Sequence, residues 1–305
     1  MGERVVILND KKLLFYNNQG KLIREVGHSY FNPAVSCSSS KALLYDIKGT
    51  TFSVETDRGT ELTQNISNDI IIGEIAENGN IAIVSEDDRY SCRLTIYDSK
   101  GTEIFKWYLA DKYITSLDFT GSGDGCVVAA LGVSNGYTET YVYRLDFSKD
   151  KEQYQTTITG SAPLMVNVMG NKAHIICDNQ AVVLDKNGGQ LNSVIYSQTI
   201  KQSVAASERY TVMLFGEDVK STSEIIVYDE NLSEVAKISN AERIRKIDSD
   251  GNHVIALYND RIVCYDMSLN QKTEYSGQSS VNDVICSLER GYSTNTTNLN
   301  SFALE

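Results

Sequence analysis

Tyr97-Asp98-Ser99-Lys100-Gly101 lies between two strand-like runs, residues 92–97 and 102–109. An Asp at the second position of such a segment caps its own backbone two residues further on, and Gly tolerates the left-handed conformation that closes a hairpin. Related segments, some with Leu in place of Gly, recur along the chain, and the residues at the Asp position are Asn17, Thr56, Asp98, Asp146, Asp185, Asp229 and Asp266. The steps between them are 39, 42, 48, 39, 44 and 37 residues. A period of this length is typical of four-stranded β-propeller blades.

The composition agrees with an all-β fold. The 305 residues include 18 Tyr and only 2 Pro, with many Val, Ile and Thr, and these residue types suit a pleated, half-buried surface. A hydrophobic fraction of 41% is ample for a packed core. The length exceeds one average domain, but large all-β domains commonly reach it as one unit.

Each repeat is predicted to contribute four antiparallel strands, except the first. Residues 4–26 supply only the outer three strands of a blade, and residues 280–286 match the inner strands of the other repeats. We therefore predict a seven-bladed β-propeller over residues 1–290, whose ring is closed by N- and C-terminal strands in one blade. Residues 291–305 are predicted to form a polar tail, and Leu304-Glu305 resembles a cloning boundary or tag remnant.

The net charge of −12, from 40 acidic residues against 28 Lys and Arg, disfavours some classes of partner. An acidic chain is repelled by phosphate backbones and by anionic lipid surfaces, so neither nucleic acid nor direct lipid binding is predicted. The densest basic patch is Arg243, Arg245 and Lys246, which we interpret as part of a soluble surface. No run of eighteen apolar residues is present to span a bilayer.

Neither a metal site nor a cofactor site is predicted, and no catalytic residue is assigned. The six cysteines include no CxxC pair, and most lie in apolar runs, where a thiol behaves as a small buried hydrophobe. Of the three histidines, His174 and His253 hold similar places in two repeats, which favours a framework role.

The hairpin segments, over the whole length, resemble those of WD-repeat and quinoprotein-like propellers. The chain departs from WD-repeat proteins because Trp107 is its only Trp and the Gly-His signature is missing. It departs from pyrroloquinoline-quinone enzymes because their Trp docking motif is absent from each blade. In its Tyr, Asn and Ser richness and its degenerate blades it is most similar to uncharacterised propellers of Gram-positive bacteria, typically exported and membrane-anchored. That resemblance implies an extracytoplasmic domain whose N-terminal membrane anchor has been removed.

Two sets of residues are candidate sites. The first lies on the longer connections between second and third strands (residues 86–91, 132–137 and 216–222), because a rigid scaffold often displays binding residues on loops. Its ligand-binding candidates are Glu86, Asp87, Asp88, Arg89, Tyr90, Asn135, Tyr137, Glu217, Asp218 and Lys220. The second set holds one equivalent polar position in six inner strands, predicted to line a central channel: Glu74, Ser116, Asn167, Ser203, Lys246 and Asp283.

The residues favour a monomeric, non-enzymatic binding or scaffolding propeller that recognises a protein, peptide or glycan. The alternative is an enzyme on the same scaffold, such as a polysaccharide lyase, a glycosidase or a quinoprotein. Glycosidase chemistry needs two converging carboxylates, and Glu74 with Asp283 is the candidate pair. The fold alone does not decide between these alternatives, because propellers have many unrelated functions.

Overall fold

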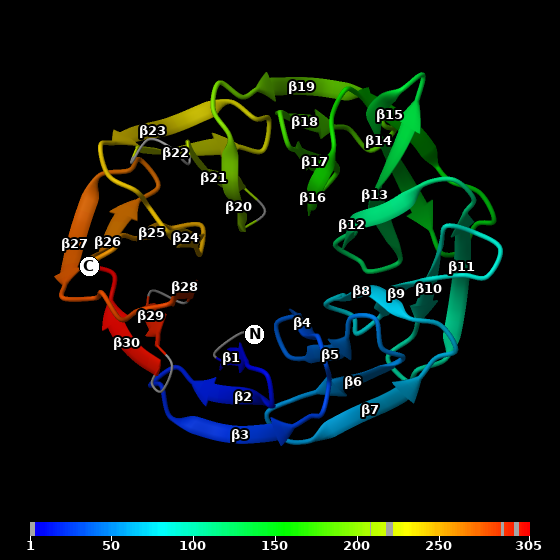
Figure 1. Ribbon diagram of the computed structural model, residues 1–305, viewed down its shortest axis with the longest axis horizontal. Coiled ribbons are helices and arrows are strands. Elements are labelled where there is room, and N and C mark those ends of the chain that lie inside the picture. The colour runs from blue at the N-terminus through cyan, green and yellow to red at the C-terminus, as the bar shows by residue number, and fades with distance from the viewer. Residues whose placement is uncertain (1–3, 208, 218–221, 288–289, 296–298) are drawn as a thin grey trace. The chain divides into compact units, whose positions relative to one another are not determined.

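The computed structural model describes residues 4–207, 209–217, 222–287, 290–295 and 299–305. Within these ranges the strands β1 to β30 form eight antiparallel sheets, and no helix long and apolar enough for a membrane span occurs. The protein is therefore an all-β propeller with eight blades (Figure 1). By its internal contacts the chain divides into two compact units, Met1–Val168 and Met169–Glu305.

The first unit contains a three-stranded sheet followed by three four-stranded sheets, and each sheet follows chain order. Their strands are β1 (Arg4–Leu8), β2 (Lys12–Asn17) and β3 (Leu22–Gly27); β4 (Pro33–Cys37), β5 (Ala42–Asp46), β6 (Thr51–Glu55) and β7 (Thr60–Asn65); β8 (Ile70–Ile75), β9 (Ile81–Ser85), β10 (Cys92–Tyr97) and β11 (Glu103–Leu109); and β12 (Tyr113–Phe119), β13 (Gly125–Ser134), β14 (Tyr137–Asp146) and β15 (Tyr154–Thr159).

The remaining sheets have four, four, four and three strands. These are β16 (Pro163–Met169), β17 (Lys172–Cys177), β18 (Gln180–Leu184) and β19 (Gln190–Ile195); β20 (Ile200–Ala206), β21 (Tyr210–Gly216), β22 (Ser223–Asp229) and β23 (Glu234–Asn240); β24 (Lys246–Ser249), β25 (His253–Leu257), β26 (Arg261–Asp266) and β27 (Gln271–Ser276); and β28 (Asp283–Ser287), β29 (Arg290–Thr294) and β30 (Leu299–Ala303).

The recurring hairpin has the conformation predicted for it. Asp98 Oδ1 accepts hydrogen bonds from the backbone N–H groups of Lys100 (2.9 Å) and Thr102 (2.8 Å), and Gly101 has φ 82°. Where Leu replaces Gly, the backbone still takes the left-handed conformation, with φ 56° at Leu232 and 58° at Leu269. The side-chain cap therefore sets this turn even where the residue is not glycine.

The prediction of seven blades closed by a shared blade is wrong. Residues 283–287 pair with β29 in a sheet of their own, instead of supplying a fourth strand to the sheet of β1. The predicted polar tail contains β29 and β30, in which Tyr292 is 1% exposed. Leu304, interpreted as a cloning boundary, is also buried and belongs to the same apolar cluster as Val281. The eighth blade escaped detection because residues 283–305 contain no segment of the kind that marked the other seven repeats.

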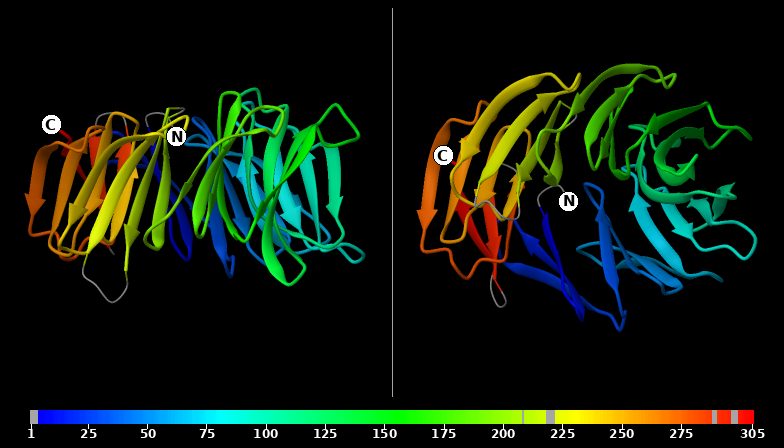
Figure 2. Two further views of the ribbon diagram at one scale, coloured as in Figure 1. Left: turned by 90° about the horizontal axis from the view of Figure 1, so that it is seen from above. Right: turned by 45° about the horizontal axis from the view of Figure 1, so that its top comes forward.

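The core lies between neighbouring sheets within each unit, and Figure 2 shows the sheets as twisted ribbons of antiparallel strands. In the first unit Val84 and Leu94 share a cluster with Val128 of the next sheet. In the second, Leu214 and Val254 pack in the same way. Because second and third strands are covered on both faces, strands such as β9 and β25 are buried at every residue. The outer strand β11 instead alternates between exposed and partly buried residues.

Candidate functional site: a basic pocket in the second unit

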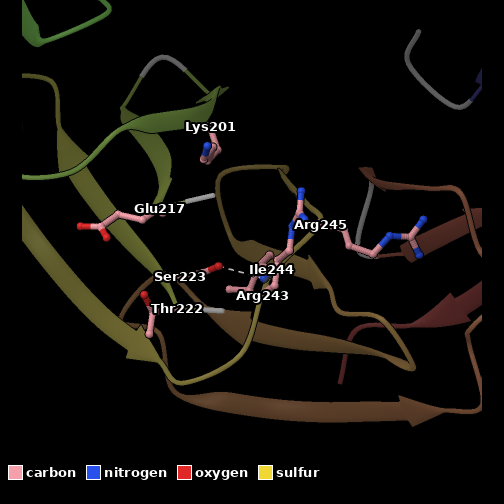
Figure 3. Close-up of a pocket in the computed structure, with 8 residues that line it drawn as sticks. Lys201, Glu217, Thr222, Ser223, Arg243, Ile244 and Arg245 are labelled. Atoms are coloured by element: carbon pink, nitrogen blue, oxygen red, sulfur yellow. Dashed lines mark hydrogen bonds between the residues drawn. The ribbon is translucent and has the colours of Figure 1, made fainter. Parts of the chain in front are cut away.

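A pocket of about 230 Å³ lies in the second unit, beside the start of β20, the end of β21, the start of β22 and the segment before β24 (Figure 3). Its charged lining residues are Lys201, Glu217, Arg243 and Arg245. In Figure 3 the Glu217 carboxylate points away from the two arginines. The pocket therefore presents mainly cationic groups to solvent.

The local backbone explains why the two arginines line this pocket. Ile244 between them is 4% exposed, and its N–H donates to Ser223 Oγ at 2.9 Å. Side chains alternate along an extended chain, so burying Ile244 directs its two neighbours to the other side. Arg245 Nη1 also donates to the carbonyl oxygen of Val281 at 2.8 Å, which holds that side chain in place.

Arg243 differs from Arg245 because no side chain holds it. It is exposed, and among the described residues it has neither an ion pair nor a side-chain hydrogen bond. Its five N–H donors are therefore available to a ligand. A guanidinium group suits carboxylates and phosphates, which it can bind through two parallel hydrogen bonds.

A second hollow of about 450 Å³ adjoins the pocket and shares Arg243 and Arg245 with it. Lys246, Asn259 and Asn282 complete its lining. Lys246 Nζ lies 2.6 Å from Asp283 Oδ2, in a pair whose side chains are 43% and 45% exposed. Together the two hollows hold four cationic side chains, two of them arginines, in a chain with net charge −12.

The sequence analysis did not predict a binding site at these basic residues. The patch of Arg243, Arg245 and Lys246 was noted there but interpreted as ordinary soluble surface. The informative signal was the order Arg-Ile-Arg-Lys, in which one apolar residue separates two cations. Buried in a strand-like segment, that apolar residue places both cations on one side.

The predicted channel-lining residues of the first unit are held by backbone and side-chain contacts. Ser116 Oγ accepts the N–H of Val166 at 2.9 Å. Burial raises the pKa of Glu74 to about 7, although a hydrogen bond with Ser36 opposes that shift. Asn167 is 7% exposed, and its Nδ2 has no hydrogen-bond partner among the described residues. These side chains lie among packed strands.

The strand register places Asp118, rather than Ser116, at the position equivalent to Glu74. Glu74 pairs with Ala82 and Asp118 with Val127, and each is one residue before the last paired residue of its strand, Ile75 or Phe119. Asp118 Oδ2 accepts the N–H of Val168, on the next inner strand, at 2.7 Å. The register shifts lie nearer the start of each strand, between Ile70 and Ile72 and between Ile114 and Ser116, so they do not cause the offset. The hairpin that follows β12 is one residue longer than the hairpin that follows β8, which moved the count made from the sequence.

In the second unit the predicted inner-strand residues fall into two environments. Lys246 and Asp283 form the partly exposed ion pair beside the basic hollow. Ser203 instead has a buried hydroxyl without a partner among the described residues. Asp283, one member of the candidate pair Glu74 and Asp283, is engaged by Lys246.

The loop candidates of the first unit form an acidic and aromatic surface. Glu86, Asp88 and Arg89 are exposed, while Asp87 forms an ion pair with Arg93 at 3.5 Å. Tyr90 stacks against Tyr108 of β11 with ring centroids 4.9 Å apart. The loop is thus tied to its own blade.

The connection at residues 132–137 differs from the long loop that was predicted there. Residues 132–137 are the end of a long hairpin, in which Ser134 pairs with Tyr137 across Asn135 (φ 52°) and Gly136 (φ 81°). Two positive φ angles in succession are typical of a tight hairpin turn. Tyr137 is 67% exposed at its tip. Of the blade-six candidates, Glu217 lines the basic pocket, and Asp218 and Lys220 lie outside the described residues.

The described residues contain no group of three or more His, Cys, Asp or Glu side chains that could hold a metal ion. His174 is a fully buried framework residue, with Nδ1 3.0 Å from Thr211 Oγ1 and Nε2 3.0 Å from the carbonyl oxygen of Glu230. The candidate site is therefore the basic pocket, with its cationic side chains, and His174 has a structural role.

Solved structures share the fold at low sequence identity. The computationally designed protein Ika8 aligns with a TM-score of 0.76 and 15% identity over 99% of this chain and 94% of its own. The C-terminal WD40 domain of Sif2 gives 0.66 and 11%, over 99% and 96%. BamB from Moraxella catarrhalis gives 0.61 and 8%, over 97% and 92%. These similarities support the predicted likeness to WD-repeat propellers at the level of the fold.

Curated proteins include no match to this chain. A family model does match it, over residues 1–299, and its description is a family of unknown function (DUF5711). Because the match spans nearly the whole sequence, the chain belongs to the DUF5711 family.

Proposed function

We propose that this protein is a non-enzymatic binding propeller that recognises an acidic segment of a protein partner. The supporting observation is the position of Arg243 and Arg245 on either side of the buried Ile244, where both line two adjoining hollows. Lys201 and Lys246 add positive charge at the edges. An acidic peptide would supply carboxylates to the guanidinium groups while its backbone follows the hollows.

Charge selects this class of partner against others. The whole chain repels polyanions at long range, so the local positive potential has to act over a short distance. A short acidic peptide can place a few carboxylates in the hollows, whereas a nucleic acid would bring a long array of phosphates against an acidic surface. The geometry therefore favours a peptide over a nucleic acid.

The test is binding of a fluorescein-labelled polyglutamate peptide, followed by fluorescence anisotropy. Arg243→Ala should weaken binding about tenfold, equivalent to about 1.4 kcal/mol, because it removes a charged donor that is exposed in the free protein. The affinity should also fall as salt rises from about 50 to about 300 mM, since exposed charges are screened within a few ångströms at high salt.

The matched control is Arg58→Ala, which removes an exposed arginine of the first unit. Neither Arg58 nor Arg243 has a side-chain partner among the described residues, so both variants should fold normally. Equal affinity of the Arg243→Ala variant and the unchanged protein would reject the proposed site. Equal losses in both variants would show that the peptide responds to net charge alone.

A further inference from the structure

A different hollow of the second unit has aromatic walls. Its volume is about 200 Å³, and it lies where the end of β19 meets β21, β22 and β23 of the next blade, strands that Figure 1 shows side by side. It shares no lining residue with the basic pocket. Three aromatic side chains, Tyr196, Phe215 and Tyr228, contribute to its lining.

The aromatic walls are fixed by packing. The rings of Tyr196 and Phe215 meet edge to face, with centroids 5.0 Å apart. Phe215 is 3% exposed and Tyr228 is 4% exposed. The hydroxyl of Tyr196 is buried and has no hydrogen-bond partner among the described residues. A buried phenol normally finds a partner, so this end of the hollow is under-satisfied in the free protein.

The charged residues of the hollow leave one negative charge uncompensated. Lys237 Nζ lies 2.9 Å from Glu224 Oε1, and Ser239 donates to the other carboxylate oxygen at 3.0 Å. These two charges neutralise each other. Glu234 is exposed at the edge of the hollow and forms no ion pair with any residue that the structure describes. The net charge of the lining is therefore −1.

We propose that this hollow binds an organic ammonium group, carried either by a small cation or by the lysine side chain of a partner. The negative faces of aromatic rings attract cations, most strongly where water is excluded. Glu234 supplies the opposite charge, and Ile195, which is 81% exposed beside the hollow, offers an apolar contact for methyl groups or a side-chain stem. A volume near 200 Å³ accommodates a trimethylammonium head, since a cavity of about 150 Å³ already holds benzene.

The experiment compares choline with its neutral isostere, in which a tert-butyl group replaces the trimethylammonium group, by NMR titration of the whole chain. Choline should bind, and the isostere should bind at least about fivefold more weakly, because the two differ in charge and hardly in shape. Equal affinities would overturn the proposal, as would the absence of binding by both. Blocked lysine and blocked trimethyl-lysine form a second arm, which distinguishes a side-chain ligand from a free cation.

Two variants locate the effect. Glu234→Gln should weaken choline binding about threefold or more without disturbing the fold, because Glu234 is exposed and unpaired. Glu86→Gln, at an exposed glutamate of the first unit, should leave it unchanged. If Glu234→Gln binds choline like the unchanged protein, the assigned site is wrong. Polyglutamate binding should be insensitive to Glu234→Gln, so the two proposals fail independently.

Discussion

The strand β12 in the first unit and the strand β24 in the second make the same hydrogen bond near their C-terminal ends but carry different residue types at their N-terminal ends. Near the C-terminal end of each, an aspartate accepts an N–H from the next inner strand: Asp118 from Val168 and Asp248 from Cys286, both at 2.7 Å. At the N-terminal end, β12 begins with Tyr113, which is 59% exposed, whereas β24 begins beside Arg245 and Lys246.

This difference shows which part of a blade is constrained by the fold. The first strand of a sheet has an unpaired edge, and its N–H groups need acceptors. A side chain from the neighbouring blade supplies one, and Ser36 does the same for the N–H of Ile75 at 3.2 Å. Contacts between blades also occur near the beginning of the strand, where Gln202 of β20 accepts the N–H of Ile247 at 2.9 Å. The residue types there differ between blades, as Tyr113 and Lys246 show, and this variation allows recognition to differ as well.

Deleting the last two strands should have the largest effect on this arrangement. Truncation after Arg290 leaves β28, the strand held by Asp248, without β29 and β30. It removes Tyr292 and Leu304, each 1% exposed, and burying a large apolar side chain contributes about 1.5–3 kcal/mol. The free energy of unfolding, measured by urea denaturation, should fall by several kcal/mol, and truncation after Leu304 should change it little. A truncation at Arg290 that unfolds like the full chain would show that the eighth blade adds nothing to stability.

The second-largest expected effect is a dependence of stability on pH, caused by the aspartates near the C-terminal ends of β12 and β24. Burial raises the pKa of Asp118 and of Asp248 from 3.8 to about 6, while backbone hydrogen bonds oppose the shift. The folded protein therefore binds more protons than the unfolded chain between these values. The resulting stabilisation is complete below about pH 4 and is lost as the pH rises through about 6, by about 3 kcal/mol for each carboxyl group.

The double variant Asp118→Asn, Asp248→Asn isolates this contribution. Asparagine keeps an acceptor oxygen for the N–H of Val168 and of Cys286 but does not titrate. Urea denaturation between about pH 4.5 and about pH 7.5 should show a shallower loss of stability in this variant. Asp88→Asn, at an exposed position, is the control. Parallel pH profiles for the double variant and the unchanged protein would contradict the raised pKa values.

The smallest effect is expected at the variable end of β24. Lys246→Met removes the ion pair with Asp283, whose side chains are nearly half exposed. Exposed ion pairs contribute about 0–1 kcal/mol, so thermal unfolding should hardly change, while polyglutamate binding should weaken modestly. A loss of several kcal/mol in the Lys246→Met variant would contradict the proposed distinction between the two ends of the strand.

Local chemistry in the sequence determined the all-β class, the hairpin caps and their spacing. Asp98 caps its turn through contacts with residues two and four positions away, so no distant part of the chain is needed to predict it. The same holds for the burial of β9 and β25, which are short runs of apolar residues. The sequence also contains the cationic residues at the start of β24, in the order Arg-Ile-Arg-Lys.

Tertiary structure alone decided the number of blades and the composition of the candidate sites. In the eighth blade Ser293 is 2% exposed, and a Cβ on Gly291 would meet the ring of Phe302, so a segment that is polar in sequence is buried by its partners. The ammonium site joins β19 to β21, β22 and β23 of the next blade, and the basic pocket joins β20 to the segment before β24. These contacts depend on how one sheet packs on the next, and the periodic pattern of the sequence does not predict that packing.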